Sequence, residues 1–437
     1  MSSTREAGYF ILESMKIKSL SSGAEVADIT NLIKDFVIRE SMSTTYLDGA
    51  TKVLDTTNLL ERLTGEETIE IVYTDFFDSR ITEEYYIYAL TGIQPYSDQQ
   101  DIGVTFDLSF CSLDKLISDS ISVRKSYNNM KTIEMVENLY NEYFTPTGVT
   151  KPLEILGDTE GANSLVIPNY RPGEAMDFLA RKAYSVTDKS SYFRFWETRE
   201  KYYFATLEGM VDAAVNSGQT LAFYYTDFQS NAEQAQLESM NRIRKLSLGD
   251  RFNTFEERNY GAYRHHVTEL DYMNRTAIEH QYNHLDEYPE YRLPSPNIQH
   301  IRSQEFINKY LAEGPDQIVV KDYPSVGATE ASLLRPNQYY AETYTRKTAN
   351  AYHHHARKIN IEINGRSRGI YPGALIELDI PKFKFPVDTQ LSSQYAGLYL
   401  IESVSHNFSG KYFTQSLTLS KSGFDGGDFN SSPTVTT

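Results

Sequence analysis

One pentapeptide of the chain has the spacing of a catalytic serine motif. The pattern Gly-X-Ser-X-Gly spans Gly365–Gly369 with Ser367 at its centre, and Asp379 and His406 follow in the order that one class of serine hydrolases uses. In those enzymes the serine lies on a sharp turn between a strand and a helix. Here residues 370–380 have the pattern of a turn and a further strand. The sequence therefore favours a plain loop between strands over a nucleophile at Ser367.

Histidines are the second set of residues that could do chemistry. His280 and His284 are four residues apart, which on a helix would place both imidazoles on one face, but no glutamate lies between them as in zinc proteases. The run 353–355 falls in a predicted helix, where neighbouring side chains point about 100° apart, so we expect His355 to pack and the others to be solvated. His265 and His266 would face opposite sides of a strand. No metal site is predicted.

Paired carboxylates and clustered tyrosines form a third set of residues that could do chemistry. The pairs at 66–67 and 83–84 lie in an acidic stretch beside predicted turns, so we expect solvated surface rather than acid and base catalysis. The tyrosines at 85, 86 and 88 could bind sugars, but tyrosine is also common in strands and at protein interfaces, which we favour. There is no glycine loop of the phosphate-binding kind, so no catalytic residue and no cofactor is predicted.

Composition sets the limits within which these residues must be positioned. The chain has 437 residues, a net charge of -17, 33 Tyr, 22 Phe and one cysteine, Cys111. The length predicts two to four packed units, the aromatic content rules out a disordered chain, and a single cysteine excludes an internal disulfide and a thiolate zinc site. The negative charge argues against a general nucleic-acid binder. Neither a membrane-spanning run nor a signal-peptide profile is visible, so we expect folding in the cytoplasm and no membrane insertion.

The charge is unevenly distributed along the chain. Residues 1–110 hold 8 Lys or Arg against 19 Asp or Glu, a balance of -11, whereas residues 341–420 hold 9 against 6, a balance of +3. The two ends of the chain therefore differ in the partners that they attract or repel.

Hydrophobic periodicity predicts two β-rich regions near the two ends. The first region is expected to contain strands at Ala27–Arg39, Thr68–Phe77, Glu84–Ile93 and Ile102–Phe110. The last region is expected to contain strands at Lys358–Asn364, Ala374–Ile380, Gly397–Phe408 and Tyr412–Ser420.

Helical periodicity marks the region between them as mixed. We expect helices at Met130–Tyr143, from Pro172 onward, and at Tyr339–Lys358, and paired strands at Tyr192–Glu197 and Lys201–Leu207. The region 226–248 is expected to form a helical turn and then a strand from Arg242 to Leu248. Residues 281–340 show no sustained period.

Three stretches in this order resemble the central baseplate hub protein of T-even-type contractile bacteriophages and its relatives in type VI secretion spikes. The first is the strand set at 26–61 and 67–76. The second is the block at 166–210, where a proline-started helix leads into the aromatic strands SYFRFWE and KYYFATL. The third is the closing set at 359–381 and 397–424, with its Pro-Gly turn and final hairpin.

This resemblance implies an α+β multidomain protein with two antiparallel β-barrel or sandwich domains of the tail-tube type, a mixed α/β domain and a loop-rich insertion. The expected boundaries are 1–109 for the first tube-type domain, 110–215 for the mixed domain, 216–280 with 341–422 for the second tube-type domain, 281–340 for the insertion and 423–437 for a flexible tail.

The resemblance also implies a function. Three copies would form a ring that adapts the hexameric tail tube to the trimeric central spike and lets DNA pass through its bore. The implied partners are the spike, the tube or tube-initiator protein, the tape measure protein and possible baseplate wedge proteins, in a virion tail assembled in the host cytoplasm. Candidate lumen or interface carboxylates are Glu70, Asp75, Asp107 and Glu402. The alternative function is a tail-associated carbohydrate-binding or carbohydrate-processing protein.

Overall fold

A computed structural model describes most of the chain. The described residues are 6–97, 102–145, 151–161, 163–188, 190–217, 220–225, 240–249, 253–283, 286, 298–299, 304–311, 316–321, 337, 339–354, 357–383, 391–392, 395–421 and 424–425. Within them the fold is largely antiparallel β, with one large sheet, several small ones and helices packed beside them. No helix in this part of the chain is both long and apolar enough to cross a membrane.

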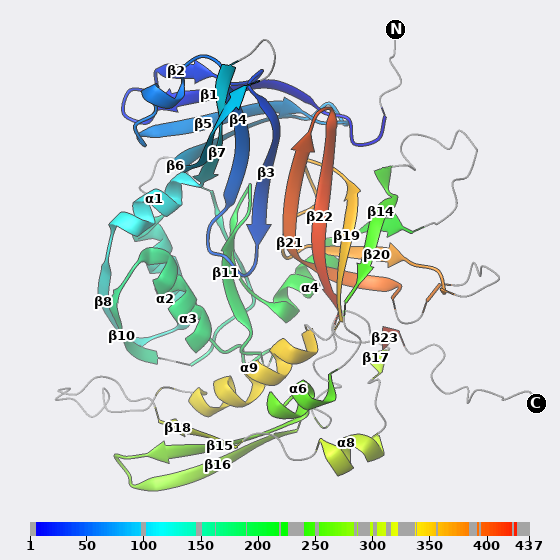
Figure 1. Ribbon diagram of the computed structural model, residues 1–437. Helices are drawn as coiled ribbons and strands as arrows, with labels where there is room; N and C mark the ends of the chain where they lie inside the picture. The colour runs from blue at the N-terminus through cyan, green and yellow to red at the C-terminus, as the bar shows by residue number, and fades with distance from the viewer. Residues whose placement is uncertain are drawn as a thin grey trace, which may run out of the picture.

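Thirteen described strands form one sheet that joins the two ends of the chain (Figure 1). Its first half contains β1 (Ile11–Ser19), β2 (Glu25–Asp28), β3 (Ile33–Ser41), β4 (Asp48–Asp55), β5 (Glu67–Thr74), β6 (Arg80–Ser97) and β7 (Ile102–Cys111). Its second half contains β13 (Leu221–Tyr224), β14 (Ile243–Leu248), β19 (Arg357–Asn364), β20 (Leu375–Asp379), β21 (Gly397–Ser409) and β22 (Tyr412–Lys421). We call these halves the first and last β units. They meet where β3 pairs antiparallel with β21, with Phe36 opposite Phe408.

The alternation of β7 shows why these residues form strands. Phe106, Leu108 and Phe110 are buried on one face while the residues between them are partly exposed, so the predicted period of two is confirmed. The expected strand Ala27–Arg39 is instead divided into β2 and β3. Asp28 causes the division, because its carboxylate accepts hydrogen bonds from the backbone N–H and the hydroxyl of Thr30 and so stabilises a turn.

Each β unit has its own hydrophobic cluster, but the clusters are not independent. The first contains Tyr73 and Phe106 and also Phe408 and Phe413 from the final hairpin. Phe408 stacks on Phe36 with ring centroids 4.2 Å apart and on Phe413 at the same distance. The last strands of the chain therefore complete the core of the first unit.

The mixed region lies beside the large sheet. It contains α1 (Leu113–Ser120), β8 (Val123–Met130), α2 (Thr132–Tyr143), β9 (Leu153–Leu156), β10 (Asn163–Tyr170), α3 (Pro172–Lys182), β11 (Phe193–Glu197), β12 (Tyr202–Thr206) and α4 (Leu207–Ser217). The predicted start of α3 at Pro172 is confirmed, and the carboxylate of Glu174 accepts the backbone N–H of Arg171 at 3.0 Å. The predicted strands around the Thr198–Glu200 turn are β11 and β12.

A separate small sheet lies at the opposite end of the molecule from β1 and β2, below α9 (Tyr340–His354) in Figure 1. It consists of β15 (Arg264–Asp271), β16 (Thr276–Asn283) and β18 (Asp316–Val320). Short elements nearby are α6 (Thr254–Asn259), α8 (Gln304–Tyr310), β17 (Ile298–Gln299) and β23 (Phe424–Asp425). The expected boundary at residue 280 falls inside β16, and β15 pairs with β16 and with β18 from the expected insertion.

Several sequence expectations concern residues that are outside the described part. The helical turn expected within 226–239, His284, His355 and most of the tail 423–437 belong to this group. The helix expected at Tyr339–Lys358 is α9, and it ends at His354 because β19 begins at Arg357. The strand expected from Arg242 is β14.

Candidate functional site

The serine motif lies on a loop between two strands of the large sheet, β19 and β20. No helix follows Ser367, so the loop interpretation is confirmed. The two glycines have conformational roles. Gly365 donates its N–H to the carbonyl of Phe413, and a Cβ at Gly365 would lie 2.2 Å from Cγ of the Phe413 ring. Gly369 has φ +81°, a left-handed conformation that favours glycine.

His406, the base that a hydrolase would need, is committed elsewhere. It is buried on β21, and its Nε2 lies 2.5 Å from Oε1 of Glu40 on β3. Its Nδ1 lies 3.0 Å from the side-chain nitrogen of Gln415 on β22. Because the amide of Gln415 donates to Nδ1, the proton of a neutral imidazole is on Nε2 and is donated to Glu40. Neither ring nitrogen is directed to Ser367 or Asp379.

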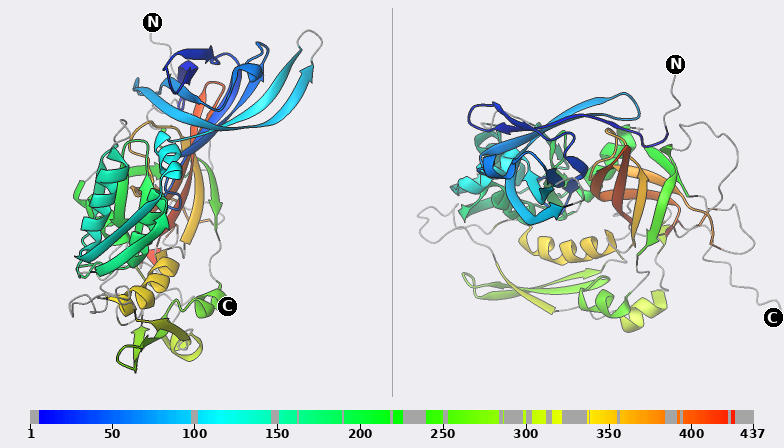
Figure 2. Two further views of the ribbon diagram at one scale, coloured as in Figure 1. Left: turned by 90° about the vertical axis from the view of Figure 1, so that its left-hand side faces the viewer. Right: turned by 45° about the horizontal axis from the view of Figure 1, so that its top comes forward.

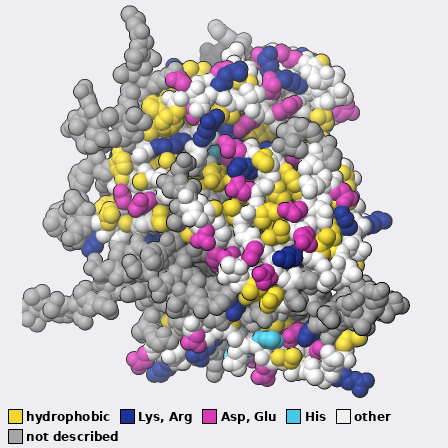
Figure 3. All heavy atoms as spheres, turned by 180° about the vertical axis from the view of Figure 1, so that it is seen from behind, with side chains coloured by type: hydrophobic (Ala, Val, Ile, Leu, Met, Phe, Trp, Pro, Cys, Tyr) yellow, Lys and Arg dark blue, Asp and Glu magenta, His cyan; other side chains and the backbone are white. Residues whose placement is uncertain are grey.

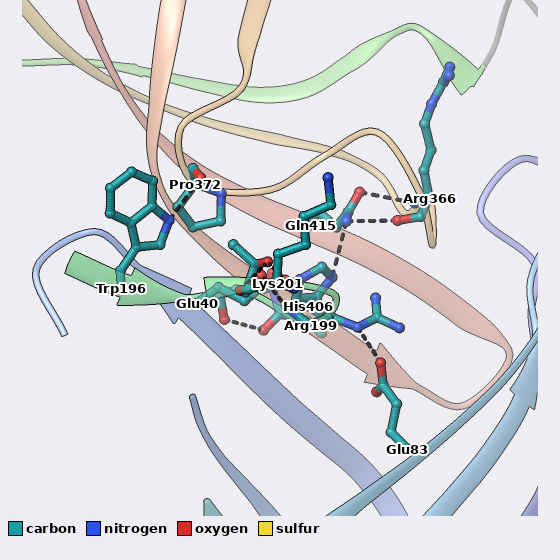
Figure 4. Close-up of polar contacts among 12 residues, drawn as sticks. Glu40, Glu83, Trp196, Arg199, Lys201, Arg366, Pro372, His406 and Gln415 are labelled. Atoms are coloured by element: carbon teal, nitrogen blue, oxygen red, sulfur yellow. Dashed lines mark hydrogen bonds and ion pairs between the residues drawn. The ribbon is translucent and has the colours of Figure 1, made fainter. Parts of the chain in front are cut away.

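Gln415 extends this network to the loop that carries the motif. Its side chain accepts the backbone N–H of Arg366 at 2.9 Å and donates to the backbone carbonyl of the same residue at 2.9 Å. Figure 4 shows Glu40, His406, Gln415 and Arg366 connected one after another by hydrogen bonds. The strand β3, the hairpin of β21 and β22, and the loop after β19 are thus held together by satisfied buried polar groups.

Arg199, on the turn between β11 and β12, attaches the mixed region to the same place. Its backbone N–H donates to Oε2 of Glu40 at 3.1 Å, and its guanidinium contacts Glu83 and the hydroxyl of Tyr73 (Figure 4). The Arg199 side chain is 8% exposed and that of Glu83 is 13% exposed. Burial is the largest influence and opposes the charge of Arg199, but Glu83, Tyr73, Tyr85 and Glu40 together outweigh it and hold the arginine pKa well above its ordinary value. We call Glu40, Glu83, Arg199, His406 and Gln415 the polar junction.

The junction corrects our expectation for the acidic pairs. Glu83 is not solvated but ion-paired with a buried arginine. Glu67 is buried as well, and its carboxylate accepts the backbone N–H groups of Thr64 and Gly65. Carboxylates beside turns satisfy backbone donors here.

Trp196 on β11 makes a second connection between the mixed region and the last β unit. Its indole N–H donates to the carbonyl of Pro372 at 3.1 Å, and its ring is fully buried. Trp196 stacks on Tyr203 with centroids 5.2 Å apart, and Tyr203 stacks on Tyr371 at 5.9 Å. This aromatic row fixes the loop after β19 against β12.

The four candidate carboxylates have different surroundings. Glu70 pairs with Lys18 at 2.5 Å, and Glu402 pairs with Lys358 at 2.9 Å. Asp75 is 2% exposed and accepts the backbone N–H groups of Phe77 and Ser79 at 2.9 Å and of Ser367 at 3.2 Å. The Asp107 side chain is 46% exposed and lies 3.9 Å from Lys52. Their role in a lumen or interface remains a prediction.

The structure places three of the candidate histidines on strands. His280 lies on the strand β16 rather than on a helix and contacts Glu269 at 3.0 Å. His265 is buried and His266 is partly exposed, as expected for neighbours on the strand β15. Among the described residues no cluster of three or more His, Cys, Asp or Glu could hold a metal ion.

The tyrosine string at 85–88 also serves mainly the chain itself. Tyr85 is buried, and the hydroxyl of Tyr86 donates to the carbonyl of Gly65 at 2.8 Å. Tyr88 is exposed, with Lys115 over its ring. A row of tyrosines open to a sugar is therefore not formed here.

The architecture is a β-rich fold in which two β units and a mixed region meet at the polar junction. Solved structures of tail proteins share this fold. The chain aligns with a tail protein from Neisseria meningitidis MC58 at 12% identity and a TM-score of 0.52, over 96% of this chain and 98% of that one. It aligns with the 43 kDa tail protein of prophage MuSo2 from Shewanella oneidensis at 10% identity and a TM-score of 0.51, over 93% and 98%.

The chain therefore has the fold of phage tail proteins over nearly its whole length, as the sequence resemblance predicted. No protein-family model matches the sequence, and no curated protein matches it. At these identities the likeness concerns the fold.

Proposed function

We propose that the chain is a structural subunit of a phage tail, the central hub of the baseplate. The observation that carries this proposal is the match in fold to two tail proteins over more than nine-tenths of each chain. The polar junction supports it, because buried ion pairs and an imidazole shared between strands suit a rigid join between two β units. We further propose that these two units are the tube-type domains of the hub.

In this proposal three copies form a ring, and the ends of the large sheet are where neighbours meet. Within the described residues β2 and β14 end the main path of strands, while β13 ends a branch beside β20 and bridges to Arg242, just before β14. Glu25 and Asp28 lie on β2, whereas Arg244 and Lys245 lie on β14. Lys245 pairs with Glu362 within the chain but remains 77% exposed. A ring requires two different surfaces that complement each other, and opposite charges on two sheet edges meet that requirement.

The remaining surface fits an interface protein. The hairpin of β6 and β7 projects beyond the body of the molecule (Figure 2), and hydrophobic side chains gather in patches among charged ones on the face shown in Figure 3. Exposed Ile93 and Tyr96 lie on β6. We propose that such surfaces bind the spike below and the tube above, while acidic groups such as Asp107 repel DNA in the bore.

The ring predicts a specific response to charge reversal. Changing Arg244 and Lys245 together to Glu is expected to weaken assembly at least about tenfold, because like charges would face each other across the contact. Changing Glu25 and Asp28 to Lys is expected to do the same, and the four changes combined are expected to restore assembly. Native mass spectrometry over a protein dilution series measures the fraction of trimer.

Lys411→Glu, at an exposed turn away from both edges, is the control for net charge. If both reversals leave the trimer fraction unchanged, the edge contact is wrong. The hub proposal has its own test in electron microscopy of the assembled protein with a trimeric spike and with glycans. A ring with a central hole that binds the spike is expected; a monomer that binds glycans would support the carbohydrate function.

A further inference from the structure

The loop Gly365–Gly369, which we call the arginine loop, carries two arginines without a carboxylate partner among the described residues. The Arg366 guanidinium lies over the rings of Phe77 and Phe223, at 5.5 and 5.4 Å, and donates to the side chain of Asn241. Its Nε is buried and has no acceptor in this part of the structure. Burial lowers the pKa of Arg366, as expected for a cation that leaves water without a counter-charge.

Arg368 lies on the other side of Ser367 and is exposed. It forms no ion pair with any residue that the structure describes. The planar guanidinium of arginine forms paired hydrogen bonds with carboxylates, so an exposed arginine beside a hollow can take an anionic partner.

A hollow of about 570 Å³ opens between this loop and the first β unit. Phe77 and Leu221 give it apolar walls, and Arg366 and Arg368 line it. Phe77 is 43% exposed although it is a large aromatic side chain. We call this space the Phe77 hollow.

The one carboxylate among the described lining residues is Asp75. Its two oxygens already accept three backbone N–H groups, those of Phe77, Ser79 and Ser367. Asp75 is therefore occupied by the turns that shape the hollow, and the hollow keeps an excess of positive charge beside an apolar wall.

The loop is fixed before any ligand arrives. Gly365 packs against the Phe413 ring, Gly369 has a left-handed backbone, and the backbone of Arg366 is held on both sides by Gln415. A rigid loop loses little conformational entropy on binding.

We propose that the Phe77 hollow binds an acidic side chain of a partner protein, presented on an extended segment next to an aliphatic residue. The carboxylate contacts Arg366 and Arg368, and the aliphatic neighbour packs on Phe77 and Leu221. The hollow lies between the first β unit and the arginine loop of one chain, with Leu221 of β13 in its wall, so a single folded chain presents it complete, and we commit to a different protein as the partner. The inference concerns a single folded chain and does not rest on the ring.

The test uses two short peptides and the full chain. Acetyl-Gly-Leu-Asp-Leu-Gly-amide and its Asn counterpart are titrated into the protein by isothermal titration calorimetry. The Asp peptide is expected to bind at least about tenfold more tightly than the Asn peptide, and 0.5 M NaCl is expected to weaken it. Arg368→Gln, an exposed change that leaves the fold intact, is expected to remove most of this preference.

Lys411→Gln is the matched control, because it removes one exposed positive charge from the same β unit. Equal binding of the two peptides, or an undiminished preference in Arg368→Gln, would overturn the proposal. A fall in the trimer fraction caused by Arg368→Gln, without any peptide preference, would assign the hollow to a second copy and would also overturn it.

Discussion

Replacing Arg199 with methionine is expected to lower the free energy of unfolding by about 3–5 kcal/mol, since the change leaves Glu83 buried without its partner. The Tyr73 hydroxyl also loses its donor, which is the guanidinium. The Glu40 carboxylate keeps its donor, because this donor is the backbone N–H of residue 199. Urea unfolding at neutral pH measures the effect.

Two variants separate the ion pair from simple loss of packing. Arg199→Met combined with Glu83→Gln is expected to recover much of the loss, because no uncompensated charge then remains in the junction. Arg39→Met removes a surface pair with Asp48, in which the arginine is 50% exposed, and is expected to cost less than about 1 kcal/mol. If Arg199→Met and Arg39→Met cost the same, the polar junction does not hold the units together.

Replacing Glu208 with glutamine is expected to stabilise the protein at alkaline pH. Glu208 lies in the first turn of α4, close to the end of β12, is buried, and its Oε2 has no hydrogen-bond partner among the described residues. Burial raises the pKa of Glu208 to about 7, and the neighbouring Asp188 and Asp212 carboxylates act in the same direction.

The raised pKa fixes the sign of the pH dependence. Between about pH 4.5, the ordinary value, and about pH 7 the folded state holds a proton on Glu208 that the unfolded chain has released. Stability from this group therefore falls as pH rises through that window and is constant above it, a loss of about 3 kcal/mol at most. The glutamine variant lacks this loss, so it should exceed the parent at pH 8 and match it at pH 4.

Thermal and urea unfolding from pH 4 to pH 8 measures this difference. Glu66→Gln is the control, because Glu66 is exposed and its replacement should leave the pH profile unchanged. A glutamine variant that follows the parent at every pH would show that Glu208 is solvated or paired.

Local patterns in the sequence predicted most strands of the large sheet, because their burial alternates with a period of two. Phe106, Leu108 and Phe110 are the clearest example. The strand β16 was missed, since Thr276, Ala277, Ile278 and Glu279 are all exposed and no alternation exists to detect. The strand β16 forms by pairing with β15, and the residues of β16 alone do not indicate this pairing.

The polar junction could not be predicted from the sequence for a different reason. His406 follows Ser367 along the chain as a catalytic base would, but its hydrogen-bond partner Glu40 is 366 residues away in the sequence. Gln415 shares the apolar face of its predicted strand with Phe413 and Leu417, which indicates a buried amide but not its partner, because periodicity reports which side of a strand is buried and not which distant strand lies against it.

The pairing of β3 with β21 also decides when the chain can finish folding during synthesis. A ribosome extends a protein by roughly 5–20 residues per second, so Phe36 and Glu40 wait roughly 20–70 seconds before Phe408 and His406 exist. During that interval the nascent first unit has an unpaired strand and uncovered aromatic rings. We therefore expect the growing polypeptide to need protection from aggregation, for example by a chaperone, until the final hairpin has been synthesised.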